Sequence, residues 1–298
     1  MTNDEIFKTN ISDYDWREVV ALTEDLPSMP NITWKAISLL ENENVSGEKL
    51  NNILSKDTAL VTRILRIANS AIFARPREIS TINQASMIIG YKTLKGIIYA
   101  ASVRKMYEDM SDVQEKVWEH SIATAIFATN IATFLKKSYL DEVFFFGMLH
   151  SLGQLALLNL ETTRREYKKV LDVIRDKSYS YLEAEQEVFG FTHSLVGALL
   201  AKKWNFPIKT CQVILHYLDP CETSIEKDEI SEKTALVRLS SLLAHKLNIG
   251  SPEGYEVSLK EIPLLSKGVG FNIDTYKKDL DNICKISKEQ FEKEKENY

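Results

Sequence analysis

The chain has 298 residues, of which 44% are apolar and 27% charged, a composition typical of a globular protein with one large or two modest domains. Its formal net charge of −5 disfavours general binding to nucleic acid or to an anionic membrane. Three cysteines without a C-x-x-C pair, an acidic N-terminus and no apolar stretch of about 18 residues predict a reduced, cytoplasmic compartment, no secretory signal and no membrane span.

The first elements of the chain carry local helix signals. Residues 1–15 are polar and are expected to form a loose arm, with structure starting near Trp16. Pro30 can begin a helix, because the first turn does not need its missing N–H. Ser46 and Asp57 are placed as N-caps of the next two helices, and Val45 as a staple for the first of them.

The helix that follows Asp57 is strongly patterned. Its buried face is predicted to contain Leu60, Ile64, Ile67, Ala68 and Ala71, and Leu65 is also expected to be well buried. Arg63, Arg66 and Asn69 lie three residues apart and form one polar stripe. Arginines on a helix are usually solvated or paired with acids, but their forked donors also suit carboxylate or phosphate partners.

Residues 81 to about 99 indicate two helices joined by a short turn. Thr81 and Gln84 form a capping box at the start, and Gly90 is placed as the C-cap. This arrangement resembles a helix-turn-helix motif, with Lys92 and Lys95 flanking the second helix. An ordinary helical corner is favoured, because the chain is acidic and few polar positions remain to contact bases.

A central stretch, residues 144–155, is apolar enough to be one buried helix with His150 in its middle. Gly147 and Gly153 weaken a helix, which indicates that other backbone approaches closely there. Asp141 is a candidate cap for this stretch. The next residue after His150 is Ser151, not an acid.

The remaining elements are also predicted to be helical. Ser180 and Glu183 form a second capping box, and Gly190 ends that helix. Thr192 is the expected cap of the next helix. Pro207 begins the helix that reaches His216. A helix over about 231–248 and a polar helix from Asp274 follow, and no alternation of period two indicates a strand, so the predicted fold class is all-α.

Four of the five histidines lie in apolar or small-residue helices: His120, His150, His193 and His216. A single such histidine is usually a hydrogen-bonded core residue. Four that converge could hold zinc or nickel, since imidazole suits those metals.

The order and context of these histidines resemble the HD superfamily of metal-dependent phosphohydrolases, with Met148–Gly153 at its His-Asp core and Ser240-Ser241 in the region of its terminal aspartate. The N-terminal motifs resemble the HDOD family more closely. They are LPSMP at 26–30, DTAL at 57–60, RILRIANSA at 63–71, ISTI at 79–82, ASMIIG at 85–90 and GFTH at 190–193.

The resemblance implies a non-catalytic bacterial signalling or regulatory module that binds a signalling protein or a small-molecule or nucleotide ligand, with a link to cyclic-di-GMP or two-component pathways. The residues agree, because Ser151 replaces the acidic ligand and no carboxylate lies at Ser240-Ser241, so a two-metal clamp is hard to build. We therefore expect no catalytic residue, no metal and no cofactor. A divergent phosphohydrolase of nucleotides or cyclic dinucleotides, or a nucleic-acid-binding regulator, is the alternative.

The expected organisation is an N-terminal helical bundle packed on a degenerate HD-type bundle. The HDOD domain is expected over 16–220, divided near 110 into its N-terminal and HD-like parts, and the helices of 221–298 are expected to complete the HD-like bundle. Six family-motif residues are candidates for an interaction or interdomain role: Asp57, Arg63, Arg66, Asn69, Ser70 and Gly90.

Overall fold

The computed structural model describes residues 24–41, 46–73, 78–106, 110–219, 229–255 and 259–298. The expected arm, Trp16 and the staple at Val45 lie outside these ranges. The described residues form helices and no strand, which confirms the all-α prediction. The helices are α2 Asn31–Leu40, α3 Gly47–Leu54, α4 Thr58–Ala68, α5 Ile82–Met106, α6 Asp112–Phe134, α7 Leu140–Leu149, α8 Leu152–Asn159, α9 Glu161–Lys177, α10 Tyr181–Phe189, α11 His193–Lys203, α12 Ile208–His216, α13 Glu229–Lys246, α14 Ile262–Gly268, α15 Ile273–Glu294 and the 3-10 turn η1 Lys295–Asn297.

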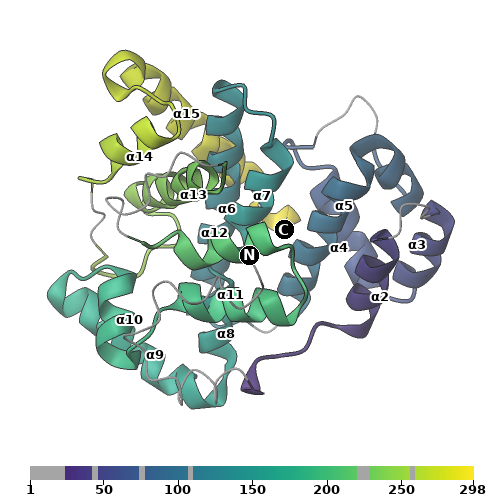
Figure 1. Ribbon diagram of the computed structural model, residues 1–298, viewed down its shortest axis with the longest axis horizontal. Helices are drawn as coiled ribbons and strands as arrows, with labels where there is room; N and C mark the ends of the chain where they lie inside the picture. The colour runs from purple at the N-terminus through teal and green to yellow at the C-terminus, as the bar shows by residue number, and fades with distance from the viewer. Residues whose placement is uncertain (1–23, 42–45, 74–77, 107–109, 220–228, 256–258) are drawn as a thin grey trace.

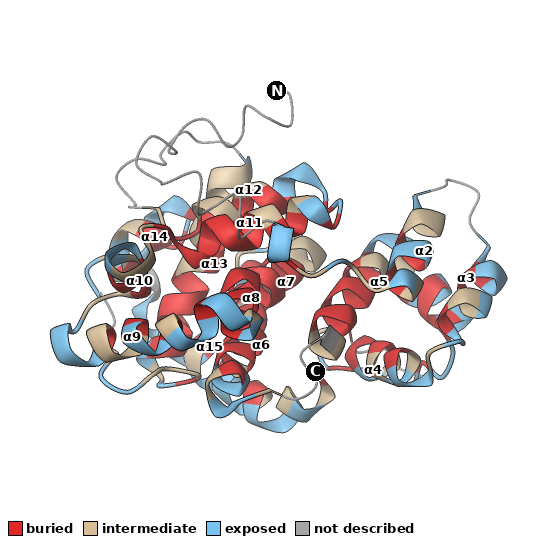
Figure 2. Cartoon of the chain, turned by 90° about the horizontal axis from the view of Figure 1, so that it is seen from below, coloured by how far each residue is buried: buried red, intermediate tan, exposed pale blue. Residues whose placement is uncertain are grey.

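Helices α2–α5 form an N-terminal bundle beside a larger bundle built on α6, with the chain's C-terminal end between the two (Figures 1 and 2). Helix α6 is the centre of the larger bundle, since α7, α13 and α15 all pack on it and most of its residues are buried. Among the described residues no single helix is long and apolar enough to cross a membrane, although one bent pair, Leu140–Asn159 with Glu161–Lys177, passes that test by length and composition.

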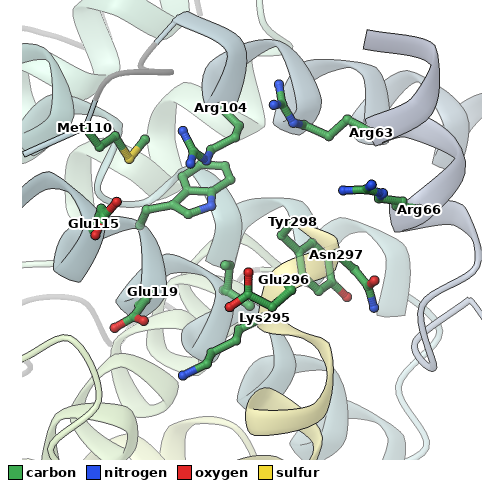
Figure 3. A pocket seen from close by; sticks show the side chains of 12 residues that line it. Arg63, Arg66, Arg104, Met110, Glu115, Glu119, Lys295, Glu296, Asn297 and Tyr298 are labelled. Carbon is green, nitrogen blue, oxygen red and sulfur yellow. The ribbon is translucent and has the colours of Figure 1, made fainter. Parts of the chain in front are cut away.

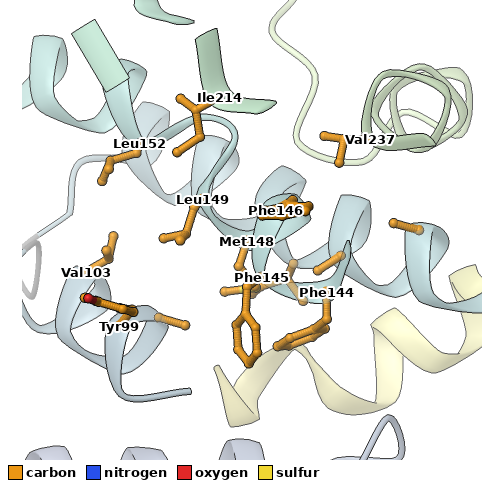
Figure 4. Close-up of a cluster of buried hydrophobic side chains, with 14 of the residues drawn as sticks. Tyr99, Val103, Phe144, Phe145, Phe146, Met148, Leu149, Leu152, Ile214 and Val237 are labelled. Carbon is orange, nitrogen blue, oxygen red and sulfur yellow. The ribbon is translucent and has the colours of Figure 1, made fainter. Parts of the chain in front are cut away.

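The two bundles share one hydrophobic core. The ring of Phe73, which follows α4 in the N-terminal bundle, lies 5.0 Å from the ring of Phe144 on α7. Tyr99 on α5 packs on Phe206 with 4.0 Å between ring centroids. A Cβ at Gly96 would come within 2.1 Å of the Phe145 ring, so glycine is needed where α5 meets α7. Figure 4 shows this cluster, in which α5, α7 and α12 contribute side chains.

Several predicted caps are present. The Ser46 and Asp57 side chains accept hydrogen bonds from the backbone N–H groups of Lys49 and Leu60. Ser180 and Glu183 form the reciprocal capping box. Thr81 accepts from the N–H of residue 84 as predicted, but the Gln84 side chain accepts from Ser80 instead of closing on Thr81.

Four predictions of local environment were wrong. Asp141 is not a cap, because it lies inside the first turn of α7 and accepts a hydrogen bond from Thr93 across the bundles (2.6 Å). Thr192 stands at the N-cap position of α11, but its side chain bonds the Ser194 hydroxyl instead of the helix backbone. Ala71 is exposed, and Leu65 is only half-buried at the edge of the core.

The central apolar stretch is two helices and not one. Helix α7 ends at Leu149, the chain turns through His150 and Ser151, and α8 begins at Leu152. The two glycines nevertheless mark close approaches as predicted. A Cβ at Gly147 would come within 2.5 Å of the Ala125 Cα, and one at Gly153 within 1.9 Å of the His193 carbonyl oxygen. The residues on either side of the His150 turn therefore pack closely against α6 and α11.

Candidate functional site

A buried cluster of histidines occupies the centre of the larger bundle. The ring of His120 on α6 stacks on that of His245 on α13 with 3.7 Å between centroids, and lies 5.2 Å from the ring of His150. The Tyr217 ring lies 5.0 Å from His150 and 5.7 Å from His193, and so connects the fourth histidine to the group. None of the four histidines is more than 7% exposed.

The structure replaces one predicted member of this cluster. His216 ends α12, is partly exposed and has its Nδ1 2.7 Å from the Asp219 carboxylate, and among the described residues it makes no ring contact with the other histidines. His245 takes part instead. A sequence signal for it exists, because Ser241 and His245 are four residues apart on α13 and therefore share a helix face.

Hydrogen bonds within the protein engage most of the ring nitrogens in this cluster. Ring N–H groups of His120 and His150 donate to the carbonyl oxygens of Ile249 (3.3 Å) and Gly147 (2.6 Å). The Ser241 hydroxyl donates to Nε2 of His120 at 2.9 Å. Two of the imidazoles are thereby fixed in one orientation by neutral groups.

His193 belongs to a buried hydrogen-bond network that includes Glu185. Among the described residues, Glu185 is the only carboxylate in contact with the histidine cluster. Both the backbone N–H and the Nδ1–H of His193 donate to Oε2 of Glu185 at 2.7 Å, while Tyr167 donates to Oε1 at 2.8 Å. The Tyr217 hydroxyl donates to the Nε2 of His193. All four side chains are buried, and their polar groups satisfy one another.

These residues do not fit the two-metal centre that the HD resemblance implies. Ser151, at the position of the acidic ligand, bonds its hydroxyl to that of Ser121. Ser241 bonds His120, and Glu185 is occupied by three protein donors. No group of three or more His, Cys, Asp or Glu among the described residues is arranged to hold a metal ion.

Burial keeps the imidazoles of His120, His150 and His245 neutral. The pKa of both His150 and His245 falls to about 3, mainly because of burial and with a small contribution from the nearby Arg238 guanidinium. Burial also holds the pKa of His120 well below its ordinary value, with His245 adding to the shift. Three imidazoles with pKa values this far below neutral pH are not poised to exchange protons near pH 7.

Three of the six family-motif residues have structural roles. Asp57 caps α4 and pairs with Lys105 at the end of α5. Asn69 ties the end of α4 to the segment before α5, since its side chain accepts from the N–H of Ile79 and donates to the carbonyl oxygens of Leu65 and Ile79 at 2.7–2.8 Å. Gly90 breaks α5 with φ 82° and ψ 160°, a conformation that favours glycine.

The corner around Gly90 packs inward. Leu94, Ile97 and Ile98 of the following segment are fully buried. Lys92 pairs with Glu142 and Lys95 with Glu41, so both lysines have acidic partners within the chain. This geometry favours the ordinary helical corner over a helix that reads DNA.

Two other motif residues, Arg63 and Arg66, line a cavity between the two bundles (Figure 3). Its volume is about 280 Å³, and α4, α5, α6 and the C-terminal turn η1 all contribute to its lining. Arg63 and Arg66 enter it from α4 and Arg104 from α5, and Trp118 lines it from α6. The sixth motif residue, Ser70, is buried.

Arg63 and Arg66 also line a second hollow of about 310 Å³, together with Thr58, Ala59 and Thr62 of α4. Arg63 and Arg66 of the stripe therefore line both hollows, whereas Asn69 lines neither. The sequence contained the arginines of α4 but no signal for Arg104, Trp118 or the C-terminal residues that close the cavity, because these come from distant segments.

Comparison with known proteins identifies the relatives of this chain. The HDOD domain family model matches residues 26–220. An "Uncharacterized protein" of Treponema pallidum (strain Nichols) is 24% identical over 185 residues, which make up 62% of this chain and 36% of that protein. The chain thus spans about a third of that relative's length.

Solved structures share the fold over nearly the whole chain. An HDOD domain protein of Geobacter sulfurreducens is 22% identical, with a TM-score of 0.69 and coverage of 92% of this chain and 96% of that one. A proposed phosphohydrolase of Shewanella amazonensis SB2B is 21% identical, with a TM-score of 0.70 and coverage of 94% and 97%. At these identities the structures establish the fold, and the family model establishes the relationship: the chain belongs to the HDOD domain family.

Proposed function

We propose that this protein is a non-catalytic regulatory module of a bacterial signalling system, which acts by binding a signalling protein or a small ligand. The observation that carries this proposal is the chemistry of the histidine cluster. Burial keeps His120, His150 and His245 neutral, and they are hydrogen-bonded to protein groups. A hydroxyl stands at Ser151, where hydrolysis would need a bridging carboxylate.

The family relationship supports a regulatory role. A proposed signal transduction protein of Marinobacter aquaeolei VT8 shares the fold with a TM-score of 0.63 at 15% identity, where this chain covers 64% of that one. The finer proposal is that this module works in a cyclic-di-GMP or two-component pathway in the cytoplasm. Its surface for this role is the cavity between the bundles, where motif arginines are gathered.

The alternative is a divergent phosphohydrolase, and one experiment separates the two. The purified protein is assayed with bis(p-nitrophenyl) phosphate, p-nitrophenyl phosphate and a cyclic dinucleotide, with and without Mn²⁺, and its metal content is measured before any metal is added. We expect no turnover above that of a His120→Ala/His150→Ala variant. A stoichiometric pair of metals, or Mn²⁺-dependent turnover that this double variant abolishes, would contradict the proposal.

A further inference from the structure

We propose that a second pocket, between α5, α7 and α12, binds a small aromatic carboxylate, with the ring among aromatic side chains and the charge at a rim of lysines. The inference rests on the proposed function in one respect, because it names a ligand class for a regulatory binding module. It uses neither the histidine cluster nor the arginine-lined cavity, so it can fail while the account of those sites stands.

The walls of this pocket are aromatic and come from both bundles. Tyr99 lines it from α5, Phe145 and Phe146 from α7, and Phe206 from the segment before α12. Figure 4 shows Tyr99 on one helix and Phe145 and Phe146 on another. Burial raises the pKa of Tyr99 above its ordinary value, so its hydroxyl is neutral and this wall carries no charge. Such walls favour contact with an aromatic ring.

The size of the pocket limits the ligand to one ring. Its volume is about 170 Å³. An apolar cavity of about 150 Å³, engineered in another protein, takes up one benzene molecule. A nucleotide or a ligand with two fused rings is therefore too large. Gly96 also lines the pocket, and a Cβ there would come within 2.1 Å of the Phe145 ring, so a larger residue would displace part of the wall.

Three lysines line the same pocket: Lys92, Lys95 and Lys209. Lys95 pairs with Glu41 at 3.1 Å and Lys209 with Glu229 at 3.3 Å. The side chains of these two glutamates are 56% and 55% exposed, so the pairs are surface ion pairs that contribute little to stability. An ammonium group has three donors, so each lysine can bind a ligand carboxylate beside its glutamate.

The charges around the pocket leave an excess of one positive charge. Glu142 is the only carboxylate among the described residues that line it, and it pairs with Lys92 and with the buried Lys233. Although burial opposes the shift, hydrogen bonds from these two lysines hold the pKa of Glu142 below its ordinary value. Lys233 also pairs with Glu229, so the ion pairs of this region join four lysines to three glutamates. An anionic ligand matches this excess.

The test uses 4-fluorobenzoate as the probe and follows its binding to the full chain by fluorine NMR. The neutral analogue 4-fluorobenzamide has the same shape, and acetate supplies the carboxylate without the ring. We expect saturable binding of 4-fluorobenzoate, about fivefold or more tighter than that of 4-fluorobenzamide, because a charge-assisted hydrogen bond is lost in the amide. Acetate should not displace the probe. Added NaCl should narrow the difference, since the rim is partly exposed to solvent.

Two variants locate the probe. Lys95→Met removes one charge and keeps an apolar stem, so it should weaken 4-fluorobenzoate severalfold and leave 4-fluorobenzamide unchanged. The exposed Lys168 on α9 provides the matched control, and Lys168→Met should bind both compounds normally. Thr210→Phe places a ring in the pocket from α12 and should abolish binding of both. Thermal melts establish that each variant is folded.

Equal affinity of the wild type for the two fluorinated compounds, no saturable binding, or affinities unchanged by Lys95→Met and Thr210→Phe would overturn the proposal. Sedimentation velocity tests another occupant. A wild-type dimer that does not bind the probe and that Thr210→Phe converts to a monomer would assign the pocket to a contact between two copies. The hydrolysis assays separate this inference from the proposed function. Turnover together with probe binding contradicts only the non-catalytic role, whereas absence of both contradicts only the pocket.

Discussion

Acid should destabilise this protein through its buried histidines. In the unfolded chain an imidazole takes up a proton near pH 6.5, whereas burial holds the pKa of His150 and His245 at about 3 in the folded protein. The unfolded state therefore binds more protons between these values. The stability that depends on neutral imidazoles is fully present above pH 6.5 and is lost as the pH falls from 6.5 toward 3.

The size of this loss follows from the two pKa values. Below pH 6.5 each such histidine lowers the free energy of unfolding of the protein by about 1.4 kcal/mol per pH unit. Between pH 7.5 and pH 5.0 this amounts to about 2 kcal/mol for each histidine. His150 and His245 together account for about 4 kcal/mol, and His120 acts in the same direction. The total is a large part of the roughly 5–15 kcal/mol by which native proteins are stable.

Urea unfolding at pH 7.5 and pH 5.0, followed by circular dichroism, measures the loss. The free energy of unfolding of a chain of this size should fall by about 3 kcal/mol or more per molar urea. The urea concentration at the unfolding midpoint of the wild type should therefore be about 1 M lower at pH 5.0 than at pH 7.5. His150→Asn keeps a donor that can reach the Gly147 carbonyl but does not titrate, so its loss should be smaller by about 2 kcal/mol.

Ile214→Val is the control, because it destabilises a buried core position by roughly 0.5–1.5 kcal/mol and leaves every histidine in place. It should show the same pH-dependent loss as the wild type. Equal losses in the wild type and His150→Asn would refute the argument that His150 is neutral because it is buried.

Four further predictions concern packing and backbone contacts. Gly153→Ala should lower the thermal midpoint by several degrees, because its Cβ would meet a carbonyl oxygen at 1.9 Å; an unchanged midpoint would mean that α8 and α11 can separate freely. Asn69→Ala removes two hydrogen bonds to Ile79 before α5 and one to Leu65 within α4, and should cost about 1–3 kcal/mol in urea unfolding. Ile67→Ala should cost about 2–5 kcal/mol and half-buried Leu65→Ala clearly less, and the reverse order would show that the face of α4 is misassigned. Ser151→Asp places a carboxylate at a fully buried position and should lower the melting temperature without creating Mn²⁺-dependent hydrolysis, so turnover in this variant would contradict the account of the site.

Much of the fold could be predicted from the sequence because its signals are local. A cap such as Ser46 or Asp57 bonds a backbone group three residues away, so the residues that decide it are adjacent in the chain. The same holds for the capping box at Ser180 and for the break at Gly90. The two central glycines, which weaken a helix, likewise indicated a close approach, although not which backbone would approach.

The tertiary structure decided which groups meet. His245 joins the cluster in place of His216 because α13 packs on α6, a contact between segments more than a hundred residues apart. Asp141 bonds Thr93 instead of capping α7 for the same kind of reason. The cavity needs Arg66 and Tyr298 side by side, and only the packing of the C-terminal turn against α4 brings them together. Local propensity acts over a few residues, whereas a site depends on which buried surfaces fit together.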